Sequence, residues 1–288
     1  MERQSEAFQE LLNLMELEQL ELNMFRGVSR DIGTKRVFGG QILAQSLLAA
    51  CHTVEERLPH SLHGYFLRAG DHTAPVVYTV DRSRDGRSFS SRRVLAIQHG
   101  QPIFTFAASF QVEEEGLEHQ FEMPEATKPE DAEPIEQLDR EEFEKLPMSL
   151  QRWLDRFGPF EFRASRGGDP DDCKPKPPFK DLWFKLHGHY MDDPVMNRAL
   201  LAYVSDFHLV GTAMLPHGIS WKHTKLMVAS LDHAMWFHRE FSLNDWLLYS
   251  CDSPNTTGGR GLSRGMIYDR GGRLVASTAQ EGVIRVRT

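Results

Sequence analysis

Three polar residues in the C-terminal half of the chain could together activate a water molecule. Asp206 lies near the end of a largely apolar segment, whereas Ser230 and Gln280 lie in later segments rich in strand-forming residues. A carboxylate can accept a proton from water, and a hydroxyl and an amide can orient that water toward an electrophilic carbon. These groups indicate hydrolysis without a covalent intermediate. The alternative is a buried aspartate that is hydrogen-bonded to a neighbouring strand and does no chemistry.

The surroundings of Ser230 and Gln280 resemble an earlier part of the chain. Ser61 is also followed by a leucine, and Gln111 follows Ser61 by fifty residues, the same separation as between Ser230 and Gln280. Self-similarity at a fixed spacing predicts one supersecondary unit that is used twice. The alternative is a chance likeness between two unrelated strands.

Each half contains the pattern of one enclosed helix followed by a sheet. Residues 39–53 are rich in Leu and Ala and have no charged side chain, which predicts a helix surrounded by other elements. Residues 194–207 have helical apolar spacing, with a proline at the first turn. Asp206 lies on this second helix, and a carboxylate there needs a role because burying it unpaired is costly. The β-rich runs are residues 61–67, 76–82, 88–98 and 103–112 in the first half, and 226–239, 245–253, 260–269 and 274–285 in the second.

Outside these two units, the chain predicts a leading amphipathic helix over residues 5–21 and a linker over residues 116–180. The linker is acidic and rich in proline, with one helix expected near residues 136–157. The expected class is α+β, with an antiparallel sheet wrapped around a long helix in each unit. The predicted divisions are residues 1–115, 116–180 and 181–288.

Composition excludes several classes of protein. The chain of 288 residues has a formal net charge of −8, which argues against general nucleic-acid binding. Its three cysteines are far apart and predict neither a disulfide framework nor a zinc site, so we expect a reducing, cytoplasmic setting. We expect no membrane span, because we find no apolar run near 18 residues, and no secretory signal. No metal or other cofactor is expected.

Two further motifs are weaker candidates for chemistry. The sequence GLSRG at residues 261–265 fits the Gly-x-Ser-x-Gly nucleophile pattern around Ser263, but predicted strands flank it and no histidine follows. Four histidines lie on the two similar segments, and structural hydrogen bonding is the simpler interpretation of each than catalysis or metal binding. They are His60, His63, His233 and His238.

Five strings of sequence spread over both halves closely resemble the acyl-CoA thioesterase II family. They are VFGGQ at residues 37–41, FLRAGD at 66–71, LPHG at 215–218, DHAMWFHR at 232–239 and VASTAQEG at 275–282. The resemblance implies a double hotdog fold and hydrolysis of fatty acyl-CoA to a fatty acid and CoA. It implies that Asp206, Ser230 and Gln280 hold the attacking water, although many members have Thr at the position of Ser230. It also suggests a homo-oligomer, either a dimer or a tetramer.

Binding of such a substrate would need donors for the thioester oxygen and for the CoA phosphates. Gly39 and Gly40 open the first enclosed helix, where backbone N–H groups could bind an oxyanion; tight packing is the alternative role for these glycines. Arg92 and Arg260 are the two arginines selected as candidates for binding phosphate. The full set of candidates is Arg82, Arg84, Arg87, Arg92, Arg93, Arg260 and Arg264.

Two other functions remain open on the same fold. An enoyl-thioester hydratase would need an aspartate and a histidine that act on the acyl chain. A protein that binds acyl-CoA without reaction would have no need to position water, so the combination of Asp206, Ser230 and Gln280 argues against it.

Overall fold

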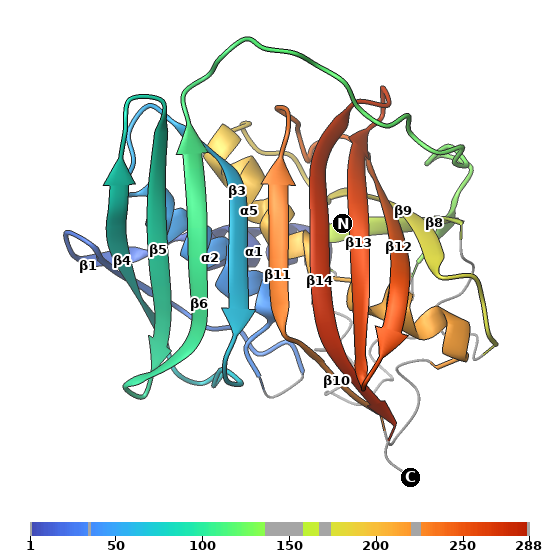
Figure 1. The fold of residues 1–288 in the computed structure, drawn as a ribbon, viewed down its shortest axis with the longest axis horizontal. Helices are drawn as coiled ribbons and strands as arrows, with labels where there is room; N and C mark the ends of the chain where they lie inside the picture. The colour runs from blue at the N-terminus through green and yellow to red at the C-terminus, as the bar shows by residue number, and fades with distance from the viewer. Residues whose placement is uncertain (1, 34–35, 136–157, 167–173, 220–225, 287–288) are drawn as a thin grey trace.

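The computed structural model describes residues 2–33, 36–135, 158–166, 174–219 and 226–286. Within them, one 14-stranded sheet runs through the whole molecule, and the helices α1, α2 and α5 lie on one of its faces (Figure 1). The opposite face carries no helix among these residues (Figure 1).

The first half of the sheet has the strand order β1-β2-β4-β5-β6-β3. Its helix α2 packs behind the strands and runs over Gly39–Cys51, two residues shorter than the predicted segment. The other elements are α1 Glu2–Met15, β1 Glu18–Glu21, β2 Met24–Gly27, β3 Leu58–Phe66, β4 Val76–Asp85, β5 Phe89–Gln98 and β6 Gln101–Gln111.

The second half repeats this arrangement, in the order β11-β14-β13-β12-β9-β8-β7. The strands β2, β4, β5, β6 and β3 correspond in order to β9, β12, β13, β14 and β11, which confirms the predicted duplication and the α+β class. The elements are β7 Glu133–Pro134, β8 Phe160–Arg166, β9 Phe179–Leu186, α5 Pro194–Ser205, the 3₁₀ helix η1 Val210–His217, β10 Leu226–Ser230, β11 Asp232–Phe237, β12 Leu247–Thr257, β13 Arg260–Asp269 and β14 Leu274–Val286.

The two halves join at the centre of the sheet, where β3 pairs antiparallel with β11 and Ala234 lies opposite His63. Behind this junction α2 contacts α5, so the cores of both halves form one continuous hydrophobic cluster. The structure therefore has the two tandem units expected of a double hotdog, with their sheets fused edge to edge.

Local sequence explains where α5 begins and ends. Pro194 occupies the first turn, and the carboxylate of Asp193 accepts a hydrogen bond of 2.6 Å from the backbone N–H of Met196. The helix ends at Asp206, which is its C-cap residue, and His208 follows with a positive φ of 59°. The end of the helix therefore fixes the position of the Asp206 carboxylate.

The predictions were incomplete in three places. The leading helix ends at Met15, and residues predicted as its last turn form β1 instead. The predicted single strand over residues 226–239 is divided into β10 and β11. The linker segment contains β7 and β8, and β9 begins just before residue 181. The helix expected near residues 136–157 lies outside the described residues, and the three divisions of the chain stay a prediction.

The first part of the linker follows the surface past the ends of the strands of the second half (Figure 1). Gln120 Nε2 donates a hydrogen bond of 2.8 Å to the carbonyl of Gly272, and the hydroxyl of Tyr268 donates to the carbonyl of Glu122. These contacts fasten the linker to the end of β13 and to the loop between β13 and β14.

One segment of the described residues, Pro194–His217, is long and apolar enough to cross a membrane by length and composition alone. From the sequence, residues 194–207 are expected to form an enclosed helix and not a membrane span. In the fold, 72% of its most apolar window is buried, because α5 lies against α2 and the sheet. Burial within the molecule accounts for its apolar character.

Candidate active site

Asp206, Ser230 and Gln280 come together at the end of α5. Gln280 Nε2 lies 2.6 Å from Asp206 Oδ1 and 3.0 Å from Ser230 Oγ, so it donates hydrogen bonds to both. Ser230 Oγ lies 3.5 Å from the same carboxylate oxygen, at the outer limit for a hydrogen bond. The three side chains predicted from separate segments therefore form one hydrogen-bonded group.

The strands set this geometry. β10 pairs with β14 so that Ser230 lies opposite Gly282, two residues beyond Gln280. At the break between β10 and β11, the backbone N–H of Leu231 donates to the carbonyl of Glu281, and the carbonyl of Leu231 accepts from Phe66. Through these two bonds, Leu231 connects the segment between β10 and β11 to β14 and to the first half of the molecule.

The group is almost completely removed from solvent. The side chain of Asp206 is 5% exposed and Gln280 is fully buried, whereas Ser230 is partly buried. A charged or polar group in such surroundings needs partners, and the hydrogen bonds from Gln280 satisfy part of that need.

His233 is a neighbour of this group whose position the sequence did not predict. Its Nδ1 lies 4.0 Å from Asp206 Oδ1, and its Nε2 lies 3.0 Å from Ser205 Oγ. Burial lowers the pKa of His233 to about 3, so the ring is neutral at pH 7. In the sequence, Ser205 is adjacent to Asp206. The contacts of both residues with His233 form because the fold brings β11 beside the end of α5.

Gly39 and Gly40 lie where α2 meets this site. A Cβ atom on Gly39 would lie 2.5 Å from Asp206 Oδ2, so only glycine allows the carboxylate this close. A Cβ atom on Gly40 would overlap the backbone carbonyl of Tyr203 on α5. The glycines therefore allow α2 to pack closely against α5, and Gly39 also against Phe66 of β3, which agrees with the packing role considered as the alternative for this pair.

Arg92 is placed in the core of the first half and not beside the trio. It is 2% exposed, and its five N–H groups are matched by five hydrogen bonds, including one of 2.7 Å to Asp85. A phosphate could bind Arg92 only by displacing these partners, so the geometry gives that assignment no support.

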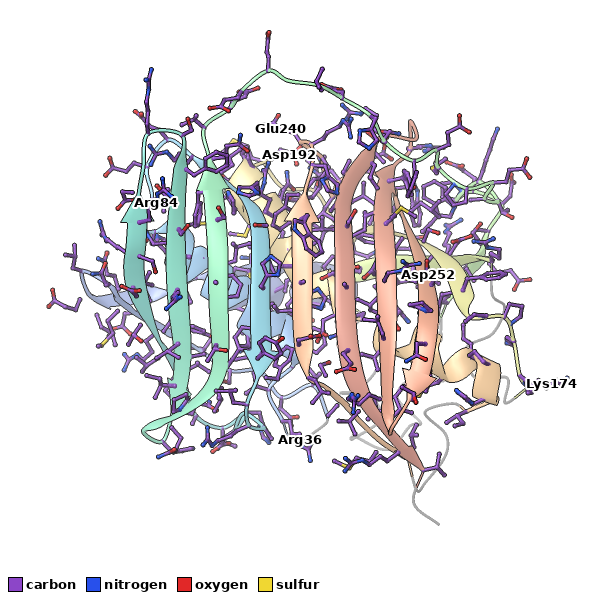
Figure 2. All side chains as sticks on the ribbon, in the orientation of Figure 1. Arg36, Arg84, Lys174, Asp192, Glu240 and Asp252 are labelled. Carbon is purple, nitrogen blue, oxygen red and sulfur yellow. The ribbon has the colours of Figure 1, made fainter. Side chains whose placement is uncertain are left out.

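Arg260 lies at the start of β13, where it is about half-exposed and its Nε lies 2.9 Å from Glu281 Oε1. The next residue, Gly261, lies opposite Gly282, which in turn lies opposite Ser230. Arg264 is exposed at the same alternation of β13 as Arg260, so both face the side without helices, where Arg264 makes a two-pronged ion pair with Asp252, which Figure 2 labels. Arg260 is therefore the more accessible of the two selected arginines, although its side chain lies on the opposite face of the sheet from Gln280.

The other histidines have structural partners. His60 Nε2 lies 2.9 Å from Ser109 Oγ, His238 Nε2 lies 2.8 Å from Ser277 Oγ, and His63 packs edge-on against Trp236. Ser263 is buried in β13 between strands, a setting that does not match a nucleophile elbow. Within the described residues, no group of three or more His, Cys, Asp or Glu side chains could hold a metal ion.

Comparison with known proteins identifies the family. The acyl-CoA thioesterase profile matches residues 176–283, and that of the acyl-CoA thioesterase N-terminal domain matches residues 28–111. Acyl-CoA thioesterase 2 of Haemophilus influenzae is 42% identical over 282 residues, covering 98% of this chain and 99% of that protein. The chain belongs to the acyl-CoA thioesterase II family.

Other members show how far the likeness extends. Acyl-coenzyme A thioesterase 8 of Homo sapiens is 40% identical over 95% of this chain and 88% of its own length. The crystal structure of acyl-CoA thioesterase II TesB2 from Mycobacterium marinum has a TM-score of 0.79 at 39% identity, with 97% of this chain and 98% of that chain covered. The agreement over nearly the whole chain confirms the double hotdog fold expected for the family.

Proposed function

We propose that this chain hydrolyses fatty acyl-CoA to a free fatty acid and CoA, with Asp206 as the general base. Membership of the acyl-CoA thioesterase II family supports acyl-CoA as the substrate. The observation that carries the choice of residues is the position of Gln280 Nε2, which is within hydrogen-bond distance of both Asp206 Oδ1 and Ser230 Oγ.

In this mechanism the carboxylate of Asp206 accepts a proton from water while the water oxygen attacks the carbonyl carbon of the thioester. The carbon–sulfur bond then breaks, and the CoA thiolate takes the proton back from Asp206. Ser230 and Gln280 hold the carboxylate and the water in the orientation for attack. One water is consumed, and one carboxylic acid and one thiol are formed.

Charge that develops on the carbonyl oxygen needs hydrogen-bond donors. We assign this role to the backbone N–H groups of Gly39 and Gly40, at the first turn of α2. The N-cap residue, Phe38, has no side-chain oxygen to cap these groups. The proximity of Gly39 to Asp206 Oδ2 supports the assignment, because a bound carbonyl must meet the base and the donors together.

A hydratase mechanism is less well supported. It would need a histidine beside the aspartate that reaches the acyl chain, and His233 is the histidine beside Asp206. His233 is fully buried, however, and its Nε2 is engaged by Ser205. Measurement of free thiol against hydrated product separates these two reactions.

The test is thiol release from acyl-CoA of several chain lengths by the wild type and Asp206→Asn. We expect Asp206→Asn to lose turnover by about 10²-fold or more, the contribution typical of a general base, with the fold retained. Ser230→Thr keeps the hydroxyl and should retain activity, whereas Ser230→Ala should lose it. Near wild-type turnover by Asp206→Asn would exclude Asp206 as the base, and binding without thiol release by the wild type would exclude the hydrolase.

The homo-oligomeric state and the cytoplasmic location stay predictions from the sequence. Residues Tyr65 and Trp236 are exposed and belong to the central strands β3 and β11, so an assembly that covers the sheet face without helices would bury them.

A further inference from the structure

Ser263, the serine of the GLSRG string, is directly opposite Gln280 in the pairing of β13 with β14. Ser263 and Gln280 are both fully buried. Buried and exposed residues alternate along β13, so Ser263 faces the helix side of the sheet, and Gln280 faces the same side. The fold therefore places a buried hydroxyl beside a residue of the candidate active site.

Both side chains have an oxygen without a partner. Ser263 Oγ and Gln280 Oε1 are buried, and neither makes a hydrogen bond to any described residue. One is the oxygen of a hydroxyl that can donate, and the other is an amide oxygen that can only accept. Each costs stability while it is unpaired, and pairing them with each other would remove both costs.

The orientation of the Gln280 amide decides whether the site works. An amide nitrogen has two N–H groups, and those of Gln280 point to Asp206 and Ser230. If the amide turned over, its oxygen would face the Asp206 carboxylate, and two acceptors would repel each other. A donor on the other side of Gln280 is what would prevent this.

Ser263 lies on that other side. Ser230 is on β10 and Ser263 on β13, and β14 with Gln280 runs between these two strands. Directly opposite residues in an antiparallel pair have Cβ atoms about 4.5–5.5 Å apart, so a rotation of the Ser263 side chain brings its hydroxyl within reach. The neighbouring positions on this face of β13 are Gly261 and Gly265, which offer no side-chain donor.

We propose that Ser263 is a positioning residue whose hydroxyl donates to Gln280 Oε1 and keeps the amide N–H groups directed at Asp206 and Ser230. Its role rests on the proposed function, because it acts only through Gln280. The serine of the GLSRG string then supports the hydrolysis without forming an acyl-enzyme.

The test is a double-mutant cycle of Ser263→Ala and Gln280→Ala, with kcat and KM measured for one acyl-CoA. We expect Ser263→Ala to lower kcat about tenfold, as for loss of one neutral hydrogen bond, with KM within about twofold. In the Gln280→Ala background the same change should lower kcat by less than about twofold, because the residue through which Ser263 acts is gone. Ser263→Thr, which keeps the hydroxyl, should have a kcat close to that of the wild type.

A matched control is Ser253→Ala. Ser253 is also buried in this sheet, where it donates 2.7 Å to the carbonyl of Leu262 and does not contact the trio. It should lower the melting temperature and leave kcat unchanged. If Ser263→Ala does not fold, Ser263→Cys keeps the shape with a much weaker donor and should lower kcat in its place.

Wild-type kcat for Ser263→Ala or Ser263→Cys, or equal losses in both backgrounds, would overturn the inference. The result for Asp206→Asn separates this failure from failure of the proposed function. If Asp206→Asn is inactive and Ser263→Ala is fully active, only the role of Ser263 is wrong. If Asp206→Asn keeps its turnover, the assignment of the general base is wrong.

Discussion

Gln280 is the residue that links the separate parts of the site. Its single nitrogen bonds the carboxylate of Asp206 and the hydroxyl of Ser230, which are carried by a helix end and a different strand. The sequence predicted Ser230 and Gln280 from their types and the repeated spacing, and Asp206 as a carboxylate on an apolar helix; the family resemblance implied that the three hold one water. It did not predict His233 or Ser263 beside them, because those contacts depend on strand pairing that no local pattern specifies.

The two arginines selected from the sequence should behave in opposite ways. We expect Arg92→Met to lower the free energy of unfolding by about 3 kcal/mol, because five hydrogen bonds of a buried guanidinium are lost, including that to the half-exposed Asp85. Its KM for acyl-CoA should stay near that of the wild type. Urea denaturation and steady-state kinetics measure the two effects.

Arg260→Ala should change stability by less than about 0.5 kcal/mol, because its ion pair with Glu281 is largely solvated. It should raise KM for acyl-CoA, and the difference should shrink at high salt as expected for a phosphate contact. The opposite result, in which the Arg92 change raises KM and the Arg260 change does not, would indicate that Arg92 contacts the substrate.

At the scale of elements, α2 and α5 approach each other through Gly39 and Gly40. The sequence predicted both helices and most strands, because apolar spacing and turn residues are local signals. It did not predict the break between β10 and β11, since the break depends on the partners of Leu231 in β14 and β3. Nor did it predict β8, whose Phe160 and Phe162 join the core from within an acidic, proline-rich segment.

Gly40→Ala should therefore destabilise the protein. The added Cβ would overlap the backbone carbonyl of Tyr203, which cannot move without shifting α5, so we expect a loss of about 2 kcal/mol or more in the free energy of unfolding. Gly116→Ala is the matched control, because a Cβ there would meet nothing within 4 Å. Equal stability of the two variants in chemical denaturation would show that the helices have room to separate.

The same position distinguishes packing from catalysis. An amide-to-ester replacement at Gly40 removes the N–H and adds no side chain, so the contact with Tyr203 is kept. If this N–H stabilises the oxyanion, kcat should fall by about 10²-fold or more, the usual effect of losing one such donor. Unchanged kcat would remove Gly40 from that role and leave its packing role intact.

At the scale of the whole molecule, duplication has produced one sheet and one core. The pairing of β3 with β11 and the contact of α2 with α5 bury side chains from both halves together. Several histidines are at least partly shielded from solvent, and His233 completely so; this loss of solvation lowers the pKa of each below its usual value. They are His52, His60, His187, His233 and His238.

This arrangement predicts loss of stability in mild acid. A histidine whose pKa is lower in the folded than in the unfolded state stabilises the fold fully above pH 6.5, and the stability is lost as the pH falls toward the folded value. For His233, which is fully buried and has a folded pKa of about 3, the loss approaches about 1.4 kcal/mol per pH unit below pH 6.5. The free energy of unfolding, measured in urea between about pH 5 and pH 8, should therefore fall on the acid side.

His233→Gln removes one of these titrating groups from the unfolded state. The variant should start from a lower stability at pH 7, because it loses the packing of the ring and its bond to Ser205. Below pH 6.5, its free energy of unfolding should fall less steeply with decreasing pH than that of the wild type. The difference in slope should correspond to about one proton, since the unfolded chain then takes up one proton fewer. Above pH 6.5 the two curves should run parallel, because neither state of either protein gains a proton at this position. Parallel curves on the acid side as well would mean that His233 is protonated in the folded protein, and the neutral ring beside Asp206 would have to be abandoned.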